Sequence, residues 1–180
     1  DGQLEWHLTS DIVRPLTGTL TMDLWTWAGK KIRTLTSAAS VDTLGSVEIR
    51  RDAIAGLISG YKPEEVLAFG RFVSNDGAVS ADSEFYFSAL KFAELRKPAI
   101  SVKPSQRDAK TIQLSVTSDQ FAPWTMLSSP LAGRFSDNGL LLFPGETRTL
   151  DFYAWEPVGD AKAFAKNLTV TTMRGSYSAD

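Results

Sequence analysis

Apolar and polar residues alternate along much of this chain, and a period of two predicts β-strands rather than helices. In the first segment Leu4, Trp6 and Leu8 fall on one face and polar side chains fall on the other. Alternation, β-branched content or a short apolar run between turns predicts further strands at residues 19–27, 31–37, 66–74, 84–92, 111–117, 140–143, 147–154 and 167–173. The sequence therefore predicts an all-β protein.

One segment, residues 62–69, is compatible with two kinds of secondary structure. Pro63 suits the first position of a helix, and Glu64 and Glu65 follow it. The strand predicted from Val66 onward competes for the same residues. Both interpretations stay open from the sequence alone.

Turn residues divide the strands, and one break is longer than the others. Asp76-Gly77 is a typical tight turn because glycine accepts positive φ without steric conflict. The alternation lapses at Arg96-Lys97-Pro98 and then restarts. Since an immunoglobulin-type sandwich takes ~100 residues, we expect domains at residues 1–98 and 99–180. The predicted fold class is two consecutive immunoglobulin-like antiparallel β-sandwiches.

Composition and charge narrow the classes of function. Of 180 residues, 43% are hydrophobic and 22% are charged, so the chain has enough apolar surface to form a core. The net charge of −2 argues against a nucleic-acid partner. No apolar run reaches the ~18–20 residues that cross a bilayer, so we expect no membrane partner. With no cysteine and a single histidine, His7, we expect no metal site and no cofactor.

Candidate catalytic residues have simpler structural interpretations. Glu64 and Glu65 are adjacent, so in a regular element they point to different sides and are best explained as a solvated acidic turn. Asp151 falls on the outward face of its strand, and His7 has no partner spacing that marks a triad. We expect no catalytic residue in this chain, which taken alone is predicted to be non-catalytic.

Two tryptophans form the first candidate site. Trp25 and Trp27 fall on the strand face opposite Leu20, Met22 and Leu24. Tryptophans on an outer face stack on sugars or dock another domain, and a wrong face assignment places them in the domain's own core. Docking, core packing and sugar stacking are therefore all open, and we expect docking.

The second candidate is the motif GRFSDNG at residues 133–139. Its composition favours a tight turn in which Asp137 or Asn138 caps the backbone, with glycine at Gly139. Arg134 is expected to pair with a carboxylate. A structural role explains this motif better than a catalytic one.

The third candidate is a glycosylation sequon, Asn167-Leu168-Thr169. If Leu168 and Val170 face the core of a final strand, Asn167 points outward and has room for a glycan. Sequons also arise by chance, so its occupancy stays open.

Several of these motifs together resemble a known family. GRFSDNG, then TRT at residues 147–149, FYAWEP at 152–157 and LTVTTMRGSY at 168–177 are similar, in order and spacing, to the C-terminal end of β-mannosidases of glycoside hydrolase family 2 of the lysosomal-type eukaryotic kind. The first half resembles the preceding immunoglobulin-like domain of these enzymes, through its tryptophan-containing strand and Phe85-Tyr86-Phe87.

The resemblance implies a function and partners. Such enzymes are retaining glycosidases that remove terminal non-reducing β-D-mannose, with both catalytic glutamates on a (β/α)8 barrel. This chain would be the last two sandwiches, and its partners the jelly-roll domain, the first immunoglobulin-like domain and the barrel, which binds the β-mannoside substrate. A secreted, lysosomal or vacuolar location would follow. The alternative is a self-standing β-sandwich module that binds carbohydrate or protein.

Overall fold

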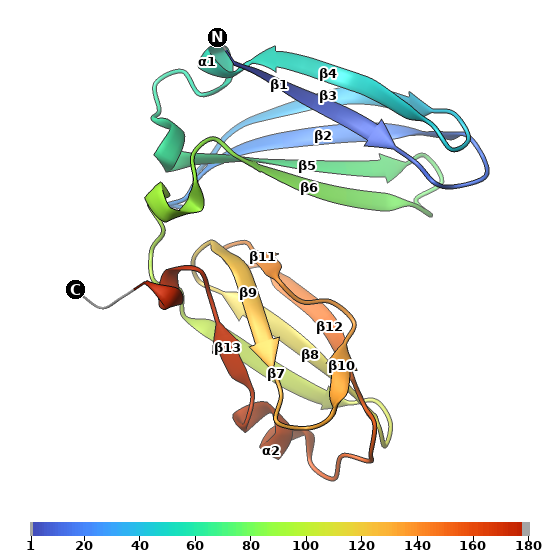
Figure 1. Cartoon of the computed structure of the whole chain (residues 1–180), viewed down its shortest axis with the longest axis vertical. Coiled ribbons are helices and arrows are strands. Elements are labelled where there is room, and N and C mark those ends of the chain that lie inside the picture. Colours follow the sequence, from blue (N-terminus) through green and yellow to red (C-terminus); the bar gives the residue numbers. More distant parts are fainter. Residues whose placement is uncertain (1, 178–180) are drawn as a thin grey trace. The chain divides into compact units, whose positions relative to one another are not determined.

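The computed structural model describes residues 2–177, which form two compact units that divide after Glu94. Each unit consists of two facing sheets whose paired strands are antiparallel (Figure 1). The predicted fold of two immunoglobulin-like sandwiches is therefore confirmed. The sequence placed the junction at Pro98, whereas the units divide after Glu94, whose N–H still donates to the Glu64 carbonyl at 3.0 Å.

The first unit pairs a small sheet with a larger one. The small sheet holds β1 and β4, and the larger has the order β3-β2-β5-β6. The bounds are β1 Gln3–Thr9, β2 Leu16–Thr26, β3 Lys31–Val41, β4 Ser46–Ala53, β5 Val66–Ser74 and β6 Ser80–Tyr86, with helices α1 Ile54–Leu57, η1 Pro63–Glu65 and η2 Leu90–Phe92.

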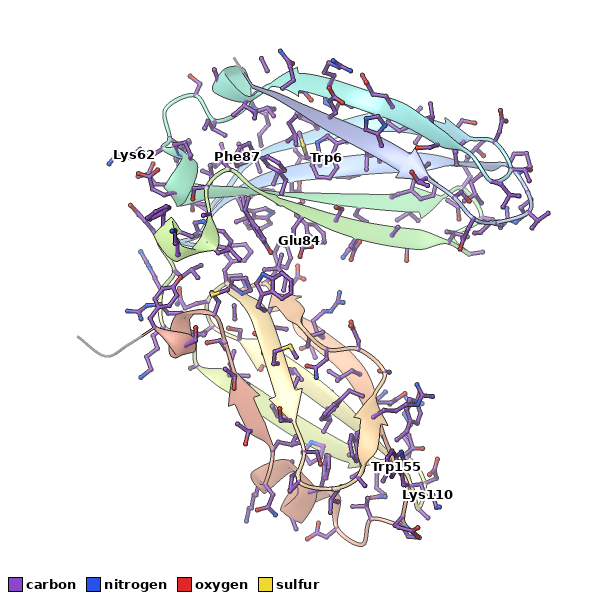
Figure 2. The ribbon with its side chains drawn as sticks, in the orientation of Figure 1. Trp6, Lys62, Glu84, Phe87, Lys110 and Trp155 are labelled. Atoms are coloured by element: carbon purple, nitrogen blue, oxygen red, sulfur yellow. The ribbon has the colours of Figure 1, made fainter. Side chains whose placement is uncertain are left out.

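The core of the first unit lies between its two sheets. Trp6 projects from β1 toward the larger sheet (Figure 2), where it packs with Met22, Leu24 and Ala68. Gly70 of β5 lies directly under the indole, and a Cβ at that position would lie 2.3 Å from a ring carbon of Trp6. A glycine in this strand therefore makes room for a tryptophan on the facing sheet.

The second unit has sheets in the orders β10-β12-β8-β7 and β11-β9-β13. Their bounds are β7 Ile100–Gln106, β8 Thr111–Ser118, β9 Ala122–Ser128, β10 Gly133–Phe135, β11 Leu140–Leu142, β12 Thr147–Ala154 and β13 Thr169–Thr171, with α2 Ala161–Lys166 and η3 Arg174–Ser176. Inward residues alternate cleanly on β8 and β12, and Phe164 of α2 completes the core between the sheets.

The structure decides between the two interpretations of residues 62–69 in favour of the strand, because the 3-10 turn Pro63–Glu65 leads straight into β5. Two other predicted elements need correction. The predicted strand at residues 84–92 ends at Tyr86, and η2 follows. The final strand shrinks to Thr169–Thr171, because Asn167 is the C-cap of a short helix, α2, that the sequence did not reveal, and Met173 is the N-cap of η3.

No helix among residues 2–177 is long and apolar enough to cross a membrane.

Candidate functional site

The outer face of the larger sheet in the first unit carries the predicted tryptophan site. Trp25 of β2 is paired in register with Leu67, and Leu67 with Tyr86 of β6. Cross-strand partners share a face, so these three side chains lie together. Trp27 joins them, because its ring centroid is 5.8 Å from that of Tyr86. The structure thus brings both predicted tryptophans into one aromatic cluster.

The exposed fraction of each side chain distinguishes docking, core packing and sugar stacking as roles for this cluster. Trp27 is only 2% exposed, and Leu67 is fully buried although it lies on an outer face. Trp25 is half-buried, with the Lys31 Nζ 4.8 Å from its ring centroid. Burial also raises the pKa of the Tyr86 hydroxyl. The buried Trp27 ring offers no open face to a sugar or to a docking partner, so a docking role of the cluster depends on Trp25 and Tyr86 and stays a prediction.

A polar hollow of about 250 Å³ lies on the same face, lined by residues of β2 and β5. The charged side chains around this hollow pair with one another. Arg71 forms two hydrogen bonds with Asp82, at 2.8 and 3.0 Å, and its guanidinium lies 5.4 Å from the Phe69 ring centroid. Asp23 accepts from Lys31 Nζ at 2.8 Å. Such pairing is typical of a structural surface rather than a ligand site.

The small sheet gathers one cluster of metal-ligand type, formed by Glu5, His7 and Glu48, whose ligand atoms lie within 4.8 Å of one another. All three are exposed, and a cationic side chain already neutralises the carboxylates. Arg51 contacts Glu48 at 2.6 Å and Glu5 at 3.1 Å. The hydrogen bond from Arg51 holds the pKa of Glu48 below its usual value. The cluster is a surface ion-pair network.

Two of the carboxylates singled out in the sequence, Glu65 and Asp151, have structural partners. Glu65 Oε2 accepts the backbone N–H of Lys62 at 2.7 Å, which closes a capping box at η1. Asp151 lies 3.6 Å from the guanidinium of Arg107. Each side chain is accounted for by local structure.

The Asp-Asn-Gly turn of the second unit is built as a structural clamp. Asp137 Oδ1 accepts the N–H of Asn138 at 2.8 Å, and its other oxygen lies 3.6 Å from Arg148. The prediction that Arg134 pairs with a carboxylate is wrong. Its guanidinium lies over the ring of Tyr153, 4.8 Å from the centroid, because Tyr153 is its cross-strand partner.

Asn138 holds this turn against the central strand β9. Its Oδ1 accepts the N–H of Leu127 at 2.9 Å, and its Nδ2 donates to the Leu127 carbonyl at 2.8 Å. Gly139 follows with φ of 74°, where glycine is favoured. A Cβ on Gly139 would lie 3.6 Å from Met126 Sδ and 4.0 Å from a ring carbon of Trp124. The turn therefore lies beside these two side chains.

Trp124 is a surface residue that the sequence pattern did not single out. Leu140 pairs with Thr125, whereas Leu142 pairs with Ala122, so β9 has one extra residue in a β-bulge. Trp124 lies within it, with φ of 53° and 52% of its surface exposed. Pro123, just before it, was the available signal, because proline inside a strand pattern marks an edge or a bulge.

Asn167 is exposed, but not for the predicted reason. It is the C-cap residue of α2 rather than the first residue of a strand, and its Nδ2 donates to the Ala163 carbonyl at 2.9 Å. Nδ2 has two N–H groups, so one is left for a glycan. Glycosylation itself stays a prediction.

Comparison with known families assigns both units. A family model described as a mannosidase Ig/CBM-like domain matches residues 2–91, and one described as an Ig-fold domain matches residues 95–176. The first match covers half of the chain, so the chain belongs to the mannosidase Ig/CBM-like domain family, with an Ig-fold domain following.

Individual relatives agree with this assignment. The β-mannosidase of Rattus norvegicus is 26% identical over 176 residues, covering 93% of this chain, and β-mannosidase A of Aspergillus niger is 25% identical over 188 residues, covering 96%. The chain is homologous to the immunoglobulin-like region of β-mannosidases. It spans only 20% of the length of each relative.

Solved structures share the fold. The β-D-mannosidase of Dictyoglomus thermophilum superimposes with a TM-score of 0.76 at 15% identity, over 96% of this chain and 20% of that protein. An exo-chitosanase of Amycolatopsis orientalis gives a TM-score of 0.60 at 17% identity, over 93% of this chain and 24% of that protein. The tandem sandwich thus occurs in glycosidases with different named activities.

Proposed function

We propose that this chain is the accessory immunoglobulin-like part of a β-mannosidase of glycoside hydrolase family 2. In this proposal the enzyme removes terminal non-reducing β-D-mannose with retention of configuration, and its two catalytic carboxylates lie outside this chain. The observation that carries the proposal is the tandem match along residues 2–91 and 95–176, together with relatives named β-mannosidase over at least 93% of the chain.

The local chemistry of the chain supports an accessory role. Glu65 is used for a capping box, and Asp137 and Asp151 are used for surface ion pairs. Retaining glycosidases need two carboxyl groups ~5 Å apart, one of them with a raised pKa. Among the residues that the structure describes, each carboxyl whose pKa departs clearly from its usual value has a lowered pKa, which is the opposite of a general acid.

In this proposal the sandwich contributes no reacting group and instead supports the rest of the enzyme by docking against it. Trp25 and Tyr86, which are partly exposed beside the buried Trp27, are the part of the first unit proposed for this docking role. Aromatic residues dominate the energetics of such interfaces because each buries roughly 150–250 Å². The docked partner is proposed to be the rest of the enzyme.

A secreted, lysosomal or vacuolar location is part of the same proposal. The exposed sequon at Asn167 supports it, because N-linked glycans are added in the secretory pathway. The likeness to a rat and a fungal enzyme is compatible with this location.

The mass of the native polypeptide tests the proposal. A peptide from this chain should be recovered from its source on a polypeptide several times heavier than 19.7 kDa, because the chain spans only 20% of its relatives. Recovery on a polypeptide of about 20 kDa without a co-purifying partner would instead favour the alternative, a self-standing binding module. The description of the first family as CBM-like is the observation that favours this alternative.

A further inference from the structure

We propose that Trp124, flanked by Met126 and Gly139, forms a stacking site for an uncharged saccharide on the outer face of the sheet β11-β9-β13. The first argument is the strained backbone of Trp124. A bulky residue at a φ of 53° costs on the order of 1–3 kcal/mol. Burial of the side chain would offset this cost, yet 52% of Trp124 is exposed. Packing within the unit therefore does not account for the conformation.

The second argument is that the backbone around Trp124 is fixed on both sides. Asn138 fixes the turn beside it through two hydrogen bonds to Leu127. The Pro123 carbonyl, directly before Trp124, accepts the N–H of Met173 at 3.3 Å. Because the backbone is already ordered, only the rotamer of the side chain has to be fixed when a ligand binds, which favours even weak binding.

The third argument is the chemistry of the face. None of the residues of β9, β11 and β13 is ionisable. Thr169 pairs with Ser128, and Thr171 with Met126, so hydroxyl groups and a thioether flank the indole. An aromatic ring with hydroxyls and no charge suits a neutral polar ligand that has an apolar face. A sugar ring has this chemistry, whereas phosphates and acidic peptides require cationic side chains.

The size of the face favours a saccharide over a protein. Strands β11 and β13 have three residues each, β9 has seven, or roughly 23 Å, and three strands span about 10 Å across. Even an area of roughly 230 Å² is far below the ~800 Å² that each partner buries in a stable protein interface. One indole on a small flat face matches a short oligosaccharide.

The class of ligand follows from the surface alone, and only the choice of a mannose-containing probe rests on the proposed function. The experiment is a titration of the 180-residue chain with β-1,4-mannotriose and, separately, with cellotriose, followed by NMR of the indole N–H signals. We expect the Trp124 signal to shift with a Kd on the order of millimolar. Substitution Trp124→Ala should remove the Trp124 signal and weaken binding at least about tenfold.

Two matched variants separate binding from folding. Trp155→Ala removes another exposed indole of this unit, 68% exposed at the end of β12 (Figure 2), and should leave the affinity unchanged. Trp124→Gly should also lose binding, yet it should keep or raise the free energy of unfolding, because glycine adopts positive φ without strain. A structural tryptophan would instead destabilise the unit when replaced by glycine.

The outcomes are distinct. Binding of mannotriose that depends on Trp124 and not on Trp155 supports the inference. Binding of cellotriose alone supports the saccharide site and counts against the mannoside assignment. The inference is overturned if neither sugar shifts the Trp124 signal. It is also overturned if protein contacts bury Trp124 in the larger native polypeptide. Neither result changes the family assignment.

Discussion

The side-chain amide of Asn138 pairs with the backbone of Leu127 as a neighbouring strand would, accepting at 2.9 Å and donating at 2.8 Å. Leu127 is buried, so its N–H and carbonyl have poor access to water, and the amide satisfies both. The turn at residues 137–139 thereby pairs with β9 just before β11 and presents Gly139 beside Trp124. The motif singled out in the sequence works as this clamp.

Replacing Asn138 tests the clamp. Asn138→Ala should lower the free energy of unfolding by about 1–3 kcal/mol, because two hydrogen bonds to a buried strand are lost. Urea denaturation measures this change. Asn75→Ala removes a single exposed amide contact, to Thr17 Oγ1 at 3.2 Å, and should change stability much less. Equal effects of the two substitutions would argue against the clamp.

The sequence predicted the parts of the fold that depend on alternation. Strands such as β8 and β12 appear in the pattern because inward residues, among them Leu114 and Leu150, alternate with polar ones. Strand β4 escaped notice because Arg50, Arg51 and Asp52 make it look like a loop, and their ion pairs show only in three dimensions. The helix α2 is too short for a helical period to emerge.

The candidate sites were predicted less completely, for reasons of backbone geometry. The shared face of Trp25 and Trp27 followed from period two, but the burial of Trp27 depends on tertiary packing. Trp124 went unrecognised because a left-handed backbone in a bulge leaves little trace in the sequence besides Pro123. Arg134 contacts an aromatic cross-strand partner, which the turn motif did not indicate.

The contact between Gly70 and Trp6 gives a second prediction. Gly70→Ala should lower the free energy of unfolding by about 1–3 kcal/mol, since the new Cβ would lie 2.3 Å from the indole. Gly56→Ala is the matched control: its Cβ meets nothing within 4 Å and it lies in α1, so it should be neutral or stabilising. Thermal denaturation of both variants compares them. Similar melting temperatures would show that the sheets separate easily at Trp6.

Burial of Trp27 leads to a third prediction. Trp27→Ala should destabilise the chain by about 3–5 kcal/mol, as large-to-small substitutions at buried positions do. Trp25→Ala should cost clearly less, because Trp25 is half-buried. Chemical denaturation followed by circular dichroism reports both. If Trp25→Ala is the more damaging change, the assigned burial of the cluster is wrong.

Asp108 gives a prediction of pH dependence. Backbone N–H groups of Lys110 and Thr111 donate to Asp108 Oδ1 at 2.8 Å each and hold its pKa below the usual 3.8. A lowered folded pKa stabilises the fold above the unfolded pKa, and this contribution is lost as pH falls through the folded pKa. The stability difference between the natural chain and Asp108→Asn should therefore shrink from about pH 5 to about pH 2. A constant difference would contradict this assignment.

The proposal that this chain is the non-catalytic part of a β-mannosidase is tested most directly by comparing hydrolysis of p-nitrophenyl β-D-mannoside by the purified chain and by the native polypeptide that contains it. We expect turnover by the native polypeptide with retention of configuration, and none by the chain. Turnover by the pure chain that is abolished by substituting one of its own carboxylates would contradict the account, as would a native polypeptide with no activity on β-mannosides.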